Sequence, residues 1–206
     1  NYAAAKDVFK RDAFDGSQNI QNFYEHVREN DAVTTHVLVN PQIDRSKPAH
    51  LETSDIVAQI VKETDAGIVI RGARMVATLC AMANELLVMP AAATWSNETR
   101  DTSDFSFGFA IPTSTSGLKF ICRPPVAHTN APSLMDHPLS LQYDESDGMV
   151  IFDDVLVPWE RVFIHRDPDF DLKVNPNSYI AHSMLMQSVV RAQAKSEFMM
   201  ALAFSI

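Results

Sequence analysis

Residues 35–47 have the sequence Thr-His-Val-Leu-Val-Asn-Pro-Gln-Ile-Asp-Arg-Ser-Lys, and this stretch decides both the fold and the predicted site. The segment from Val33 to Val39 predicts a strand, which the Asn40-Pro41 step ends. The strand carries His36, and the turn presents polar and charged side chains together. An imidazole can donate a hydrogen bond to a phenolate or a flavin edge, and a guanidinium suits a phosphate. The alternative is a buried strand histidine followed by a solvated charged turn.

Further short strands are predicted on the C-terminal side of this stretch. They cover residues 51–61, 67–79, 85–89, 105–111, 118–122, 139–143 and 149–157. The polar segment 62–65 and the segment 144–148, which ends in an Asp-Gly step, are predicted turns. Many short strands at this spacing indicate an antiparallel barrel or sandwich.

Helical periodicity replaces the strand pattern at both ends of the chain. Residues 1–32 are predicted to end an N-terminal helical domain, in which Val8, Phe9, Ala13 and Phe14 form an apolar stripe and Ser17 caps the next helix. Residues 33–175 are predicted to form a central β-domain that carries the site, and 176–206 to begin a C-terminal helical domain. The fold class is therefore α+β. The chain starts without Met and ends within an apolar helical pattern, so we expect it to be a piece of a longer protein.

The composition excludes several classes of function. Hydrophobic residues make up 46% of the chain, which is too apolar for disorder, yet no stretch is long enough to span a bilayer. There is no signal-peptide pattern. The net charge of −9, without a cluster of Lys and Arg, argues against a nucleic-acid partner. We expect a cytoplasmic protein.

Cysteine usage and familiar motifs narrow the chemistry further. Cys80 and Cys122 lie among apolar residues, which is typical of reduced core thiols, and a disulfide between them has no support in the sequence. Without a CxxC pair, no metal site is predicted. The chain also lacks the Rossmann, P-loop, HExxH and GxSxG motifs, so a nucleotide cofactor would have to bind in another way.

Two other places carry candidate residues. Within residues 71–78, Gly72 permits a close backbone approach and Thr78 offers a hydroxyl to a ring carbonyl or nitrogen. The alternative there is a solvent-facing basic turn beside an ordinary strand. His182, near the start of the last helix, would act as a general base on a phenol because imidazole titrates near neutral pH. Its alternative is a structural helix histidine.

Three stretches, taken together, resemble the 4-hydroxyphenylacetate 3-hydroxylase family, the oxygenase components of two-component flavin-dependent phenol monooxygenases. They are residues 36–46, residues 67–78 and residues 152–163, the last with the sequence Phe-Asp-Asp-Val-Leu-Val-Pro-Trp-Glu-Arg-Val-Phe. The similarity spans nearly the whole chain. It implies an acyl-CoA-dehydrogenase-like fold, with N-terminal helices, a central antiparallel β-barrel or sandwich and a C-terminal helical bundle. It also implies a homotetramer.

The resemblance implies a specific reaction. A separate NAD(P)H:flavin reductase supplies reduced FAD (FADH2), and the oxygenase reacts it with O2 to a C4a-hydroperoxide that is protected from water. An oxygen atom then enters ortho to the hydroxyl of a 4-substituted phenol of the 4-hydroxyphenylacetate type and gives a catechol. Such enzymes serve the catabolism of aromatic compounds.

The resemblance also implies roles for particular residues. His36 would contact both the phenol and the flavin, and would be catalytic together with His182, which resembles a base proposed in chlorophenol-hydroxylating relatives. The other expected cofactor contacts are Val37, Leu38, Gln42, Ile43, Asp44, Arg45 and Thr78. The substrate loop would include Ala91 and Ala92, where family members tend to offer a hydroxyl, so the ring substituent stays open.

Several alternatives remain at this point. A 4-hydroxybutyryl-CoA dehydratase would need a His-x6-Cys pair, but Val189 follows His182 at that spacing. An acyl-CoA-dehydrogenase-like flavoprotein would use a carboxylate base and hold its FAD permanently. A third alternative is an inactive, truncated paralogue. The family's Arg and Tyr that grip the phenol should precede Asn1, and the segment that completes the FAD site should follow Ile206. We therefore expect the present residues alone not to hydroxylate phenols.

Overall fold

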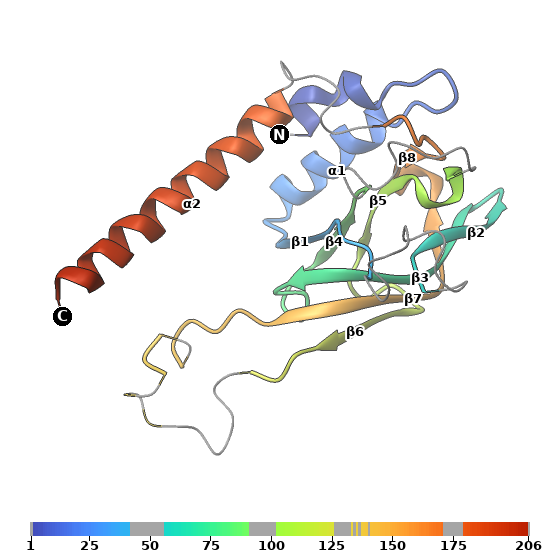
Figure 1. Ribbon diagram of the computed structural model, residues 1–206. Helices are drawn as coiled ribbons and strands as arrows, with labels where there is room; N and C mark the ends of the chain where they lie inside the picture. The colour runs from blue at the N-terminus through green and yellow to red at the C-terminus, as the bar shows by residue number, and fades with distance from the viewer. Residues whose placement is uncertain are drawn as a thin grey trace.

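Helices flank a pair of β-sheets in the order that the sequence predicts (Figure 1). The computed structural model describes residues 2–41, 56–90, 102–125, 133, 135, 137–139, 141–170 and 179–205. The helical elements are η1 (Ala3–Phe9), α1 (Ser17–Glu29), η3 (Ser103–Phe105), η4 (Trp159–Arg161) and α2 (Tyr179–Phe204). The strands are β1 (Thr34–Val37), β2 (Gln59–Thr64), β3 (Gly67–Thr78), β4 (Glu85–Val88), β5 (Phe107–Pro112), β6 (Leu118–Cys122), β7 (Asp147–Pro158) and β8 (Val162–His165).

The strands form two four-stranded sheets, one in the order β1-β4-β5-β8 and the other in the order β2-β3-β7-β6. Every neighbouring pair is antiparallel except β1 and β4, which run parallel. The predicted α+β class with antiparallel sheets is confirmed, although the two sheets do not close into a barrel. The long pairing of β3 with β7 forms the centre of the second sheet.

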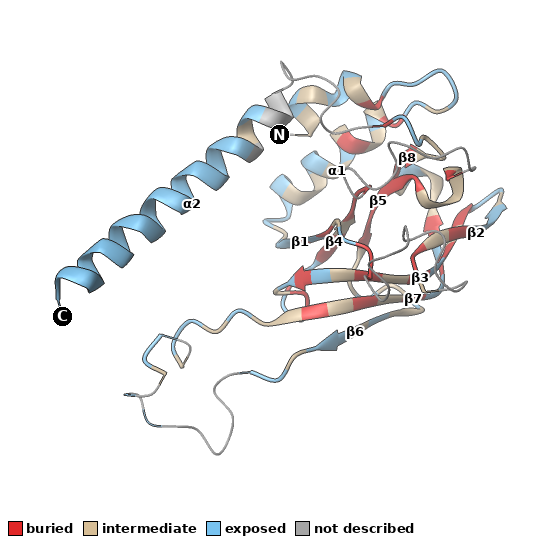
Figure 2. Ribbon diagram, in the orientation of Figure 1, coloured by how far each residue is buried: buried red, intermediate tan, exposed pale blue. Residues whose placement is uncertain are grey.

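Buried residues lie along strands of both sheets (Figure 2), and side chains from both sheets pack into one hydrophobic cluster. Ile68 and Ile70 of β3 are fully buried, whereas Val69 between them and Arg71 after them are less buried, as the two-residue period of a strand requires. Phe109 of β5 stacks on Phe107 at 5.7 Å and meets Phe152 of β7 edge-on at 5.9 Å. Burying each such ring contributes roughly 1.5–3 kcal/mol, so these contacts hold the two sheets together.

Helix α1 packs its apolar face against β8. Ile20 is buried, and the Phe23 ring lies 5.6 Å from that of Phe163. The amide of Asn19 donates hydrogen bonds of 2.8 Å to the carbonyls of Trp159 and Val162. The N-terminal helices therefore cover the sheet that contains β1 and brace the turn between β7 and β8.

A buried carboxylate joins three elements on this side of the molecule. Glu85 of β4 is 3% exposed, and its carboxylate contacts His26 of α1 at 2.9 Å and Arg161 of η4 at 3.3 Å. Burying a carboxylate is costly unless such partners compensate for its lost hydration. The sequence gives no hint of this cluster, because its three residues are far apart along the chain.

Helix α2 extends away from the sheets, and its residues 185–204 are all exposed (Figure 2). Its exposed side chains include large apolar groups, namely Leu185, Met186, Val189, Val190, Phe198, Met199, Met200, Leu202 and Phe204. A helix that is apolar on all sides is normally covered by other structure. We therefore propose that α2 begins a helical domain. A boundary near residue 32 would separate the N-terminal helices from the β-domain, and a boundary near residue 175 would separate the β-domain from α2. None of the described helices is long and apolar enough to cross a membrane.

Several local predictions are wrong. The segment 139–143 forms turns where it is described, not a strand. Strand β8 is not predicted, because it follows β7 after only three residues and the sequence pattern does not show so short a break. The predicted turn at 62–65 lies mostly within β2. Residues 51–55 of the strand predicted at 51–61 lie outside the described residues. In the predicted stripe, Ala13 and Phe14 are not helical, because the chain reverses through a bridge between Lys10 and Asp15.

Two further predictions, a helix cap at Ser17 and a turn at Asp147-Gly148, are also wrong. Ser17 does not cap α1; the carboxylate of Asp15 accepts a hydrogen bond of 3.0 Å from the Ser17 backbone N–H, and Gly16 is the residue before the helix. The Asp147-Gly148 step does not turn the chain but begins β7. Gly148 is small because a Cβ there would lie 2.5 Å from the sulfur of Cys80.

Gly72 provides a test of the packing between β3 and the segment before β2. Its φ of +114° and the carbonyl oxygen of Val57, which would lie 2.5 Å from a Cβ, both require glycine. We expect Gly72→Ala to lower the free energy of unfolding by about 2–4 kcal/mol, measured by urea denaturation. The control is Gly108→Ala, where the new Cβ would meet the flexible side chains of Ile164 and Met89 and no backbone atom, so the loss should stay below about 1.5 kcal/mol. Equal losses would contradict the assignment.

Candidate functional site

The predicted site lies where β1 meets the end of β3. Beyond β1, Val39 and Met75 exchange backbone hydrogen bonds of 3.2 and 2.8 Å. The hydroxyl of Thr35 donates a hydrogen bond of 2.7 Å to the carbonyl of Thr78. These bonds link an edge strand of one sheet to a central strand of the other, and they bring Thr35, the neighbour of His36 in the chain, against Thr78. We call the surface formed by residues 36–38 and Thr78 the β1–β3 wall.

The side chains of the β1–β3 wall alternate between the core and the surface. Thr35 and Val37 are buried, so His36 points outward and is exposed. Leu38 is partly buried. Thr78 is also exposed, and its hydroxyl donates a hydrogen bond of 2.7 Å to the carboxylate of Asp147. The alternative of a buried strand histidine is therefore wrong, and both polar groups of the wall are accessible to a ligand.

Polar groups without partners lie next to the β1–β3 wall. The guanidinium of Arg74 is fully buried, and neither it nor the buried amide of Asn40 has a hydrogen-bond partner among the described residues. Arg74 lies over the ring of Phe107 at 5.2 Å, and burial lowers its pKa to about 10. Unpaired buried groups cost free energy, so a polar partner for them is expected in the whole protein.

The structure brings only part of the predicted site together. His36, Val37, Leu38 and Thr78 lie in the β1–β3 wall, whereas the predicted cofactor contacts at 42–45 and the substrate contacts at 91–92 lie outside the described residues. His182 is exposed on α2, a helix that contacts η1. None of the described contacts joins His182 to His36.

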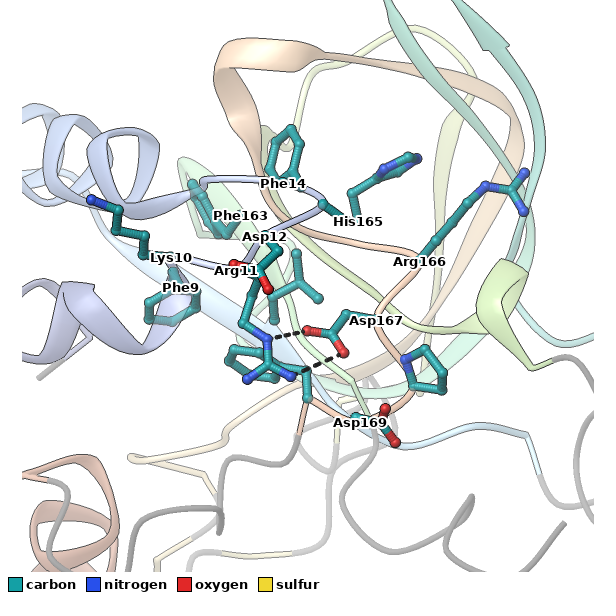
Figure 3. A pocket seen from close by; sticks show the side chains of 14 residues that line it. Phe9, Lys10, Arg11, Asp12, Phe14, Phe163, His165, Arg166, Asp167 and Asp169 are labelled. Atoms are coloured by element: carbon teal, nitrogen blue, oxygen red, sulfur yellow. Dashed lines mark hydrogen bonds and ion pairs between the residues drawn. The ribbon is translucent and has the colours of Figure 1, made fainter.

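A separate cavity of about 570 Å³ lies between residues 9–14 and 163–170 (Figure 3). Arg11 and Asp167 form an ion pair of 2.7 Å at its side, and Arg166 pairs with Glu63 and Asp104 on other elements. Arg11, Arg166 and Asp167 are thus already paired. None of the predicted site residues lines this cavity, so it is distinct from the β1–β3 wall.

Comparison with known proteins identifies the family. Residues 1–164 match the family described as 4-hydroxyphenylacetate 3-hydroxylase N terminal. The chain belongs to this family. It is 40% identical, over 95% of its own length, to the 4-hydroxyphenylacetate 3-monooxygenase oxygenase component of Thermus thermophilus. It is 38% identical, over 71% of its length, to the oxygenase component of a 4-nitrophenol 2-monooxygenase from a Rhodococcus species. The chain spans only 39% and 27% of these two relatives.

Solved structures agree with this family assignment. A crystal structure of the oxygenase component of 4-hydroxyphenylacetate 3-monooxygenase, complexed with FAD and 4-hydroxyphenylacetate, matches with a TM-score of 0.79 and 39% identity. The match covers 95% of this chain and 39% of that one. An archaeal 4-hydroxybutyryl-CoA dehydratase matches with a TM-score of 0.66 over 77% of this chain and 31% of that one, but its 23% identity shows a shared fold alone. The acyl-CoA-dehydrogenase-like fold that the resemblance implied is confirmed.

Two neighbouring residues of β1 distinguish a ligand-facing side chain from a structural one. We expect His36→Ala to change the free energy of unfolding by less than about 0.5 kcal/mol, because the imidazole is exposed. Thr35→Val should lower it by about 1–2 kcal/mol, because a buried hydroxyl loses its bond to the Thr78 carbonyl. Chemical denaturation of both variants measures the difference. A larger loss for His36→Ala than for Thr35→Val would show that His36 has a structural role.

Proposed function

We propose that the whole protein is the oxygenase component of a two-component, FADH2-dependent aromatic hydroxylase that converts a 4-substituted phenol to a catechol. The observation that carries the proposal is the β1–β3 wall, on which His36 and Thr78 are both exposed and face a possible ligand. The family assignment supports it, because a family member at 39% identity binds FAD and 4-hydroxyphenylacetate in its crystal structure.

The described residues fit one side of a flavin site. A planar heterocycle needs an exposed, rigid surface with a few polar groups at fixed positions. The β1–β3 wall offers the Thr78 hydroxyl and the backbone of Val37 and Leu38, held in place by the hydrogen bonds between β1 and β3. Gln42, Ile43, Asp44 and Arg45 would complete the cofactor contacts. Bound reduced FAD would react with O2, through the hydroperoxide that the resemblance implies, and supply the oxygen atom.

His36 would position and activate the phenol. Its imidazole would donate a hydrogen bond to the phenol oxygen and stabilise the phenolate form. A phenolate directs electron density to the ortho carbon, which is where the oxygen atom would enter. His182 would take the phenol proton if the start of α2 reaches the bound ring in the whole protein. Ala91 and Ala92 would line the ring substituent.

The partners follow from the same chemistry. A separate NAD(P)H:flavin reductase would supply FADH2, and the protein would work in the cytoplasm as a homotetramer. The exposed apolar side chains of α2 support an assembly in which this helix is covered. The phenol itself stays open, because the relatives named above are described with 4-hydroxyphenylacetate and with 4-nitrophenol.

Activity of the whole protein tests the proposal. The protein is mixed with a flavin reductase, FAD, NADH and O2, and offered 4-hydroxyphenylacetate, phenol, 4-nitrophenol and a chlorophenol in turn. We expect a catechol product from at least one of them, identified by mass spectrometry. NADH consumption without a catechol from any phenol would contradict the proposal, and stoichiometric iron in the purified protein would favour a dehydratase.

The role of His36 has its own prediction. We expect His36→Ala to lower catechol formation roughly 100-fold, the typical effect of losing one hydrogen-bond donor to a developing charge. His36→Gln keeps an N–H donor and should restore part of that loss. Thermal unfolding of both variants is the control, and it should match the unaltered protein because the side chain is exposed. Unchanged catechol formation by His36→Ala would remove His36 from the site.

A further inference from the structure

Two cysteines from distant parts of the sequence meet beside the β1–β3 wall. Cys80 lies in the turn directly after β3, and Cys122 is the last residue of β6. Both strands pair with β7, and Gly148 of β7 is the register partner of both Ala77 and Cys122. The two sulfur atoms are 3.7 Å apart. They are therefore in contact across the sheet, although both are free thiols.

Gly148 provides the space in which the thiols meet. A Cβ at this position would lie 2.5 Å from the sulfur of Cys80 and 3.6 Å from that of Cys122. Any larger residue would push the Cys80 side chain away. The close approach of the thiols thus depends on a glycine that the hairpin interpretation of the sequence had placed in a turn.

We propose that Cys80 and Cys122 are a reversible disulfide site, oxidised by hydroperoxides such as hydrogen peroxide. The sulfur atoms of a disulfide are about 2 Å apart. The present separation of 3.7 Å must therefore shorten by about 1.7 Å, which is roughly the length of one side-chain bond. Cys80 can make that movement because it belongs to a turn and not to the paired part of β3. The proposal does not depend on the hydroxylase function.

The two thiols have different roles in the reaction. Cys122 is exposed and Cys80 is 1% exposed, so the oxidant meets Cys122 first. The Cys122 thiolate attacks one peroxide oxygen, which forms an S–O bond, breaks the O–O bond and releases hydroxide. The Cys80 thiolate then attacks the Cys122 sulfur, which forms the S–S bond and expels the second oxygen as hydroxide. With the two thiol protons, these hydroxides become two waters, and the two sulfurs together lose two electrons.

Burial protects Cys80 from direct oxidation. It raises the pKa of the Cys80 thiol to about 11, and the hydrogen bond with Cys122 acts in the same direction. A thiol with a raised pKa is a poor nucleophile toward a dissolved oxidant. Cys80 can still react with a sulfenic acid on Cys122, because the two groups are already in contact and the reaction is effectively unimolecular. The crosslink would fix the turn that directly follows Thr78 to the end of β6.

Peroxide titration of the whole protein tests the site. The reduced protein is treated with hydrogen peroxide near stoichiometry, its remaining thiols are blocked with N-ethylmaleimide, and its peptides are analysed by mass spectrometry without reductant. We expect one intramolecular peptide pair joined through Cys80 and Cys122, which dithiothreitol separates. If both cysteines are recovered alkylated, or if Cys122 is recovered only as a sulfinic acid, the proposal is overturned.

Two matched variants test the order of the steps. In Cys80→Ser, the Cys122 sulfenic acid has no partner, so dimedone should trap it in a large fraction of the protein. In Cys122→Ser, the buried Cys80 should stay reduced under the same treatment. Dimedone labelling at Cys80 instead would overturn the assignment of Cys122 as the first thiol to react. The variants test only the order of the two steps. The crosslink measurement on the unaltered protein decides whether the disulfide forms.

Discussion

The attachment of the edge strand β1 to the end of β3 is the constraint on which the rest of the structure depends. Three hydrogen bonds make it: the bond from the Thr35 hydroxyl to the Thr78 carbonyl and the two backbone bonds between Val39 and Met75. They join two sheets that are otherwise held mainly by apolar contacts, together with Arg74 of β3 over the Phe107 ring of β5 and Glu63 of β2 paired with His165 of β8. Because Thr35 and Val37 are fixed inward, His36 has to face outward.

The sequence predicts this part of the molecule well because local pattern and tertiary structure agree there. Strand β1 lies within the segment 33–39, Gly72 is required by a close approach, and helices occur at both ends of the chain, although Ala13 and Phe14 are not helical. The exposure of His36 also follows from strand alternation once Val37 is known to be buried. What could not be predicted depends on contacts between distant residues. The Glu85 cluster, the meeting of Cys80 with Cys122 and the second role of Gly148 all arise from the pairing of strands.

Two features indicate how the chain relates to a larger protein. The chain spans 39% of its Thermus relative, and it displays an apolar helix, α2, that no described residue covers along most of its length. In the interior, Arg74 and Asn40 lack hydrogen-bond partners among the described residues. Both features are unfavourable by themselves, and additional structure packed on α2 would relieve the first of them. We propose that the β1–β3 wall is one side of a site whose other side is supplied by residues outside it.

A crystal structure of the whole protein with FAD and a phenol would test the central claim most directly. Our account predicts that the isoalloxazine ring lies against Thr78 and the backbone of residues 37–38, with the phenol oxygen within hydrogen-bonding distance of the His36 imidazole. A flavin bound elsewhere, with His36 in contact with no ligand, would contradict the account even if the two sheets were found as described here.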